Sequence, residues 1–233
     1  MLEVIYHGHS FVEIANHNGS IFIDPFITGN PFCDINLESI NLDKIKAIIL
    51  THGHQDHIGD TFSLLNQKKD LPIFATYEIG NFLQKSNNAE NIFHMHIGGT
   101  RDFQDFVVKF VSAVHGGGIG ESNSETGIAA GVVVRIDGKS IYHAGDTALH
   151  YDMKLLGEYD KIDLAFLPIG GNFTMGIDDA VIATSFVKPK TVVPIHYNTW
   201  DVIAQDPIDF ARKVMSEGFA TPKVLNPGQK IVY

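Results

Sequence analysis

Four metal-ligand side chains directly after a short apolar strand constrain this chain more than any other feature. The strand is expected over Ala47–Leu50, because an unbroken apolar run of this length is typical of a strand buried on both faces. His52, His54, Asp56 and His57 then follow within six residues. Imidazole nitrogens and carboxylate oxygens are ligands of Zn²⁺ and neighbouring transition metals. A solvated loop does not need this density of histidine, so the segment predicts a metal site.

The spacing of the four side chains indicates how they can be shared between ions. His52 and His54 lie two residues apart, so in extended backbone they project to the same side and can bind one ion. Asp56 and His57 come after the chain has begun to turn and can face a second ion. Gly59 permits the tight path that this turn requires.

Three further polar side chains each follow an apolar strand: His115, Asp146 and His196. Each is a weak signal by itself, because a histidine at the end of a strand is more often structural than a ligand. As an ordered series they are more informative, since ligands gather at strand ends in layered α/β folds.

Strands and helices alternate along the whole chain, and no linker divides it. Asn18-Gly19 and Asp137-Gly138 are hairpin signals, which fit poorly with a single doubly wound parallel sheet. The pattern favours an α/β sandwich of two sheets with helices outside, as one domain over residues 1–233 with similar halves at about 1–115 and 116–233. The expected strands are Leu2–Tyr6, Phe11–Ala15, Ile21–Asp24, Ala47–Leu50, Ile73–Ala75, Ile92–His96, Phe106–Val111, Gly131–Ile136, Ser140–His143, Leu164–Pro168, Thr191–Ile195, Lys223–Leu225 and Gln229–Val232, and the expected helices are Thr61–Gln67, Tyr77–Lys85, Asp178–Val187 and Pro207–Gly218.

The H-x-H-x-D-H spacing resembles the signature of the metallo-β-lactamase superfamily. That resemblance covers nearly all of the chain and implies a four-layered αββα sandwich of two mixed sheets with helices outside. Four other strings resemble small uncharacterised bacterial and archaeal metal-dependent hydrolases, which are distantly similar to ascorbate-6-phosphate lactonase and phospholipase D-type members. These strings are Gly8–Ser10, Ile23–Phe26, Pro168–Gly176 and His196–Thr199.

The same resemblance implies a dinuclear metal site and a hydrolytic function. Zn²⁺ is the first expectation for both divalent ions, and Mn²⁺, Fe²⁺ and Ni²⁺ are alternatives. A hydroxide that bridges the ions would attack a phosphodiester, lactone or related ester. Gln55 stands where di-iron relatives have a glutamate ligand, which disfavours redox use, and Asp146 stands where antibiotic-hydrolysing members have a cysteine. The implied ligands are His52, His54 and His115 for one ion, Asp56, His57 and His196 for the other, and Asp146 between them.

Three residues are candidates for catalytic roles, each with a structural alternative. Asp56 is expected to steer the attacking hydroxide as well as bind metal. His9 is either a proton donor to the leaving group or a turn residue between two strands. Asn172 is either a donor to a developing oxyanion or part of a polar glycine-rich loop without a catalytic role.

Two further residues are candidates for supporting the ligands. Asp24 precedes a proline and is either a turn residue or a carboxylate that orients a ligand such as His52. His143 lies three residues before Asp146 and is expected either inside a sheet layer or beside the ligands.

Composition narrows the partners and the compartment. With 17 basic and 27 acidic residues the formal net charge is −10, which argues against an extended nucleic-acid partner. Cys33 is the single cysteine, so an internal disulfide is excluded and a cytoplasmic location is expected. No signal peptide or membrane span is recognised. From the acidic charge and the resemblance to hydrolases we expect a small-molecule substrate. From the compact members of the hydrolase subset that the chain resembles, we expect a homo-oligomer. The alternative functions are a non-catalytic metal-binding or sensing domain and a nucleic-acid-processing phosphodiesterase.

Overall fold

The structure contains two seven-stranded mixed sheets, one in each of two units. The computed structural model describes residues 1–119 and 125–233. The first unit comprises Met1–His96, Gly116–Ile128 and Asn226–Tyr233, and the second comprises Ile97–His115 and Ala129–Leu225. Two mixed sheets with helices confirm the expected α/β class. The assignment of residues 1–233 to a single domain stays a prediction.

The sheet of the first unit brings the carboxyl ends of five strands to one edge. Its strand order is β16-β1-β2-β3-β4-β5-β6. Strands β1 to β3 form an antiparallel meander, and β3 to β6 are parallel. Because β1 and β3 each oppose β2, the strands β1, β3 and β4 run in the same direction and their carboxyl ends share an edge. The bounds are β1 Glu3–Tyr6, β2 Val12–Asn16, β3 Gly19–Ile23, β4 Ile45–Ile49, β5 Ile73–Thr76, β6 Ile92–Met95 and β16 Lys230–Val232.

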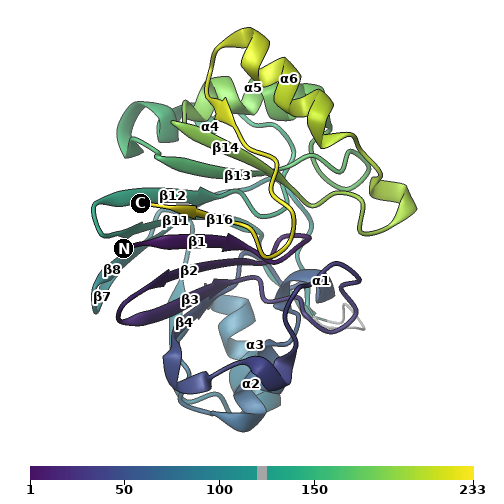
Figure 1. Cartoon of the computed structure of the whole chain (residues 1–233). Coiled ribbons are helices and arrows are strands. Elements are labelled where there is room, and N and C mark those ends of the chain that lie inside the picture. The colour runs from purple at the N-terminus through teal and green to yellow at the C-terminus, as the bar shows by residue number, and fades with distance from the viewer. Residues whose placement is uncertain (120–124) are drawn as a thin grey trace. The chain divides into compact units, whose positions relative to one another are not determined.

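Helices α2 and α3 cover one face of this first sheet (Figure 1). Every residue of β4 is buried, as expected for a strand covered on both faces. The buried residues Leu64 of α2 and Leu83 of α3 join Ile48 and Ile73 in one hydrophobic cluster. The remaining elements are α1 Gln55–Ile58, α2 Thr61–Gln67, α3 Tyr77–Asn87, the 3₁₀ helices η1 Leu37–Ser39 and η2 Leu42–Lys44, and the short strands β9 Gly118–Ile119 and β10 Glu125–Thr126.

The sheet of the second unit brings the carboxyl ends of five strands to one edge. Its order is β15-β14-β13-β12-β11-β8-β7, with β12 to β15 parallel. The Asp137-Gly138 turn joins β11 to β12, and β8 opposes β11, so β8 runs in the same direction as β12. The bounds are β7 Thr100–Phe103, β8 Phe106–Ser112, β11 Ala130–Ile136, β12 Lys139–His143, β13 Leu164–Pro168, β14 Thr191–Ile195 and β15 Thr221–Pro222.

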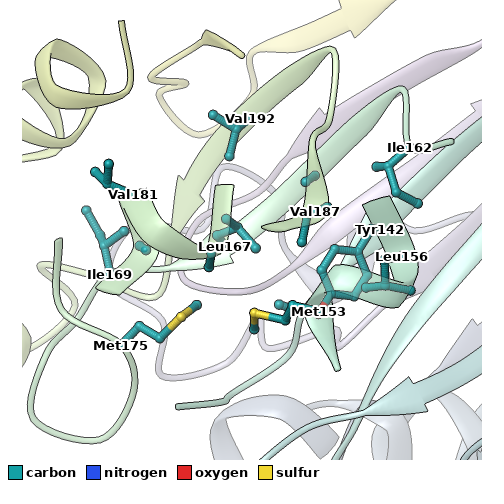
Figure 2. Close-up of a cluster of buried hydrophobic side chains, with 14 of the residues drawn as sticks. Tyr142, Met153, Leu156, Ile162, Leu167, Ile169, Met175, Val181, Val187 and Val192 are labelled. Atoms are coloured by element: carbon teal, nitrogen blue, oxygen red, sulfur yellow. The ribbon is translucent and has the colours of Figure 1, made fainter. Parts of the chain in front are cut away.

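Helices α5 and α6 lie along one face of the second sheet (Figure 1). Figure 2 shows the packing behind this contact, where Met153, Leu167 and Val187 belong to one buried cluster. Asp206 caps α6 through its side chain, and Gly218 ends it with φ of 71°. The bounds are α4 Met153–Leu155, the π-helix η3 Leu156–Asp160, α5 Ile177–Val187, η4 Asp201–Ile203 and α6 Pro207–Glu217.

Some elements have the bounds expected from the sequence, and others differ from them. The helix Thr61–Gln67 and the strand Thr191–Ile195 are found with the expected bounds. The strand expected at Lys223–Leu225 is instead Thr221–Pro222, a two-residue edge strand beside β14 in which the N–H groups of Thr221 and Lys223 donate to the carbonyls of Lys190 and Val192. No helix in the described part of the chain is long and apolar enough to cross a membrane.

Candidate metal centre

The end of β4 presents His52 and His54 to the same side, as their spacing predicts. Nε2 of His52 lies 3.1 Å from Nδ1 of His54. Two nitrogen ligands with metal bonds of about 2.0–2.1 Å lie roughly 3.3 Å apart around a tetrahedral ion, so this separation suits a shared ion. Gly53 allows the approach of β9, because a Cβ there would lie 2.8 Å from Cγ1 of Ile119.

A buried carboxylate orients His57. Oδ2 of Asp24 lies 2.7 Å from Nδ1 of His57, and both side chains are fully buried. The same carboxylate accepts hydrogen bonds from the N–H of Thr51 at 2.8 Å and from its hydroxyl at 2.6 Å. A carboxylate on Nδ1 fixes the imidazole ring so that Nε2 is the atom presented to a metal. Of the two expected roles for Asp24, support of a candidate ligand is observed, and the residue it supports is His57 in α1 in place of His52, the example given.

His9 lies beside Asp56 at the carboxyl end of β1. Its φ of 53° places the ring in the turn after Gly8, and the residue is buried. Nε2 of His9 is 3.1 Å from Oδ2 of Asp56, and that oxygen is 4.0 Å from Nε2 of His57. His9, Asp56 and His57 therefore each offer a ligand atom within one small volume of the first unit.

Asp60 supports this region and was missed in the sequence. Its Oδ2 accepts hydrogen bonds from the backbone N–H groups of Ile27 at 2.8 Å and Thr28 at 2.7 Å, and its own N–H donates to the carbonyl of Pro25. Asp60 thus ties the loop after Asp24 to the start of α2. Its place directly after Gly59 was the only signal in the sequence, and the spacing of the ligands does not extend to it.

In the second unit a carboxylate lies between two imidazoles. Oδ2 of Asp146 is 3.6 Å from Nε2 of His115 and 3.0 Å from Nε2 of His196. Asp146 and His196 are buried, and the side chain of His115 is 13% exposed. A carboxylate oxygen flanked by two ring nitrogens is the arrangement expected of a ligand shared between two ions.

Thr147 ties together three loops at this edge and was also missed in the sequence. Its hydroxyl accepts from the N–H of Val114 at 3.0 Å, and its carbonyl accepts from the N–H of Met175 at 3.0 Å. His143 acts on the same turn, because its Nδ1 accepts from the N–H of Gly145 at 3.1 Å. His143 is fully buried in β12 and therefore shapes the turn that carries Asp146.

Asn172 is exposed in the loop after β13. Gly171 has φ of 86°, and its N–H donates to the carbonyl of Met175, which closes the loop on itself. At the base of this loop, a Cβ on Gly170 would lie 2.5 Å from the carbonyl oxygen of His196. The loop therefore approaches the segment of His196 closely, while the exposed side chain of Asn172 is left available to a substrate.

His7 occupies an acidic enclosure two residues before His9. Nδ1 lies 2.7 Å from Asp34 and Nε2 lies 3.0 Å from Glu13. Burial lowers the pKa of His7, but the hydrogen bonds and charges of Glu13 and Asp34 outweigh burial and raise the pKa above 6.5. Cys33 is a poor nucleophile, since burial raises the pKa of its thiol to about 11.

A cavity of about 460 Å³ in the second unit is separate from these clusters. Its walls are mainly apolar and include Val111, Leu155 and Tyr159. None of the seven candidate ligands lines it, so the candidate chemistry lies elsewhere.

The donor chemistry of each unit fits divalent metal ions. The first unit presents imidazoles and a carboxylate, with the buried Asp24 behind one ring, and the second presents a buried carboxylate between two imidazoles. Burying ionisable groups at this density is costly unless they are paired or coordinate a metal. Neutral imidazole with carboxylate is a ligand set that Zn²⁺, Mn²⁺ and Fe²⁺ accept.

Comparison with known proteins places the chain in a family. The family described as "Beta-lactamase superfamily domain" matches residues 20–197. The chain belongs to the beta-lactamase superfamily. It is 48% identical over 234 residues to a UPF0173 metal-dependent hydrolase of Bacillus cereus strain G9842, and 49% identical to one of Bacillus thuringiensis subsp. konkukian, with 99% of each chain covered.

Solved structures agree with this membership. Igni18, a metallo hydrolase from Ignicoccus hospitalis, matches with a TM-score of 0.88 and 33% identity over 100% of this chain and 98% of its own. The metallo-β-lactamase fold protein YhfI of Bacillus subtilis shares the fold with a TM-score of 0.77 at 13% identity, with both chains fully covered. The expected superfamily, its fold and the class of metal-dependent hydrolases are confirmed.

Proposed function

We propose that this chain is a dinuclear metal hydrolase that cleaves a small-molecule ester, lactone or phosphodiester. The observation that carries the proposal is Asp146, whose Oδ2 lies within 3.6 Å of two imidazole nitrogens. A carboxylate in that position would be suited to act as a ligand shared by two divalent ions. The proposed ligands are His52, His54 and His115 for one ion and Asp56, His57 and His196 for the other, with Asp146 shared.

The ligands are drawn from both units, as the superfamily signature implies. Support comes from each unit taken by itself. In the first, His52 and His54 are spaced for one ion and Asp24 sets the ring of His57. In the second, Asp146 lies between its two histidines.

The residues of the chain have distinct proposed roles in the reaction. Divalent ions held by the proposed ligands would supply an acidified water and would polarise the substrate oxygen. Asp56 steers the attacking group as well as binding metal. His9 holds a proton at Nε2 against Oδ2 of Asp56 and transfers it to the leaving oxygen. Asn172 donates from its exposed side chain to the oxyanion that develops on the substrate.

Metal counting combined with hydrolysis tests the proposal. The wild type, stripped and reloaded with Zn²⁺ or Mn²⁺, is expected to bind two ions per chain by elemental analysis. It is expected to hydrolyse at least one of bis(p-nitrophenyl) phosphate, an aryl ester, a lactone and a thioester. Asp146→Asn should lose an ion and at least about 100-fold in rate. One ion per chain in the wild type, or full activity in Asp146→Asn, would contradict the proposal.

A second variant separates ligand orientation from ligation. Asp24→Asn keeps the shape of the side chain but weakens the acceptor on Nδ1 of His57. Loss of such an outer partner typically costs about 10–100-fold in metal affinity. Asp70→Asn, at an exposed aspartate of the same unit, is the matched control and should bind metal as the wild type does.

A further inference from the structure

The basic residues of the chain are absent from every segment that carries a candidate ligand. All 17 lysines and arginines lie outside six stretches of the sequence. These stretches contain His9, all seven candidate ligands and Asn172, and they are residues 1–43, 47–67, 110–134, 140–153, 162–187 and 191–211.

Strand direction accounts for the positions of four of these basic residues. Lys44 precedes β4, Lys139 opens β12, and Lys161 and Lys190 precede β13 and β14. These cations therefore lie at the amino ends of the strands, and the ligands follow the carboxyl ends. Lys190 already binds Asp163 at 2.7 Å near the amino end of β13.

The carboxylates near the ligands balance the charge of the proposed ions. Two divalent ions bring four positive charges, and Asp24, Asp56, Asp60 and Asp146 bring four negative ones. With the ions bound, these groups leave no excess of positive charge to attract a polyanion. Fields that steer anionic substrates normally come from lysine and arginine around the site.

Large apolar side chains are exposed on the same cation-free stretches. In the second unit Phe173 is 54% exposed, Trp200 40% and Val202 54%, and in the first unit Phe32 is 49% exposed. Exposed aromatic and aliphatic groups on loops near a catalytic edge are suited to apolar substrate groups.

We propose that the substrate is an uncharged, apolar carboxylic ester or lactone, and that phosphodiesters and phosphorylated compounds are poor substrates. This inference rests on the proposed function and narrows it. Water is the only other reactant. The hydroxyl group of the water forms a bond to the acyl carbon, the acyl C–O bond of the ester breaks, and the remaining proton of the water is transferred to the leaving oxygen.

Fluorescence of the single tryptophan tests the charge of the surroundings without using activity. Trp200 follows His196 by four residues and is accessible to small quenchers. In metal-loaded protein, iodide should quench Trp200 no better than caesium, each measured relative to neutral acrylamide and to free N-acetyltryptophanamide. Iodide quenching that exceeds caesium quenching by about twofold would overturn the proposed electrostatics.

Matched substrates test the selectivity. The uncharged p-nitrophenyl butyrate should be hydrolysed with kcat/KM at least about tenfold above that of the anionic mono-p-nitrophenyl succinate, and above that of bis(p-nitrophenyl) phosphate. Salt raised from about 20 to about 200 mM should reduce the difference in kcat/KM between the butyrate and the succinate, since screening weakens the repulsion of the anionic substrate by the negative net charge of the chain. Equal or faster hydrolysis of either anionic compound would overturn the inference.

A pair of lysine variants makes the test specific to the site. Val202→Lys adds a cation beside Trp200 and should raise both iodide quenching and the succinate-to-butyrate ratio of kcat/KM by severalfold. Met215→Lys adds the same charge at another exposed position, on α6, and should change neither. If no ester is hydrolysed, the proposed function fails, whereas the quenching result still decides the electrostatics by itself.

Discussion

A single buried carboxylate shows how much one residue decides in this protein. Asp24 has φ of 51° and accepts three hydrogen bonds, two from Thr51 and one from His57. This aspartate before a proline therefore orients the ring of His57, a candidate ligand, in addition to forming a turn. The choice between those readings depended on a contact across 33 residues of sequence.

His7 leads to a prediction about pH and stability. Burial lowers the pKa of His7, but Glu13 and Asp34 outweigh burial and raise it in the folded protein. The protonated imidazole therefore stabilises the folded chain, and this stabilisation is complete below the unfolded pKa of about 6.5. That effect is lost as pH rises through the folded value. His7→Gln should cost about 2 kcal/mol in the free energy of unfolding at pH 6, and less at pH 9.

Urea unfolding of metal-free protein across this pH range measures the difference. His17→Gln, at an exposed histidine in the β2–β3 turn, is the control and should show no such trend. The contribution of Glu13 to the free energy of unfolding has the opposite pH dependence and is lost at low pH. Burial raises the pKa of Glu13, but the hydrogen bonds to His7 and Ser20 and the charge of His7 lower it overall, so its contribution is lost as pH falls below about 4.5. A loss of stability in His7→Gln that grows toward pH 9 would contradict the prediction.

Among elements, the short helix α1 depends most on its ends. His54 is its N-cap residue, and Gly59 ends it with φ of 48° and ψ of −129°, a conformation that suits glycine. A Cβ on Gly59 would lie 2.4 Å from the carbonyl oxygen of Pro25 and 2.8 Å from Cα of Phe26. Both obstacles are backbone atoms, so a side chain at this position has no room.

Gly59→Ala should therefore be strongly destabilising. We expect a loss of about 2–4 kcal/mol in the free energy of unfolding, together with weaker metal binding by His57. Gly138→Ala is the matched control, because Gly138 also has positive φ but has open space around it, and it should cost about 1 kcal/mol. Equal losses of unfolding free energy in the two variants would show that the close approach of Gly59 to Pro25 does not contribute to the cost of Gly59→Ala.

The sequence predicts most long elements because their apolar patterns are local. Strand β13 and helix α2 were found with their expected bounds. The π-helix η3 and strand β7 were not expected, since their formation depends on partners supplied by other parts of the chain. Strand β7 pairs with β8. The residues of β7 are mostly exposed and show no clear alternation of apolar and polar side chains.

For the whole molecule, metal removal should affect both units. If all seven ligands hold the ions, adding Zn²⁺ at about 100 times Kd should stabilise the folded chain by about 2.7 kcal/mol for each ion bound. Hydrogen exchange should slow both near His57 in the first unit and near Gly145 in the second. A chelator should reverse both effects, and Asp146→Asn should greatly reduce them. Protection confined to one unit would contradict a site with ligands from both.

The sequence by itself predicted the candidate donors, and it determined their order along the chain and most of the strands that precede them. It also determined the separation of cations from ligand-bearing segments, because these features depend on local pattern and spacing. Only the tertiary structure decided that Asp24 supports His57, that Asp60 holds the loop after β3, and that Thr147 joins three loops. These contacts join strand ends that are distant in sequence, and spacing along one segment carries no information about which ends the sheet brings together.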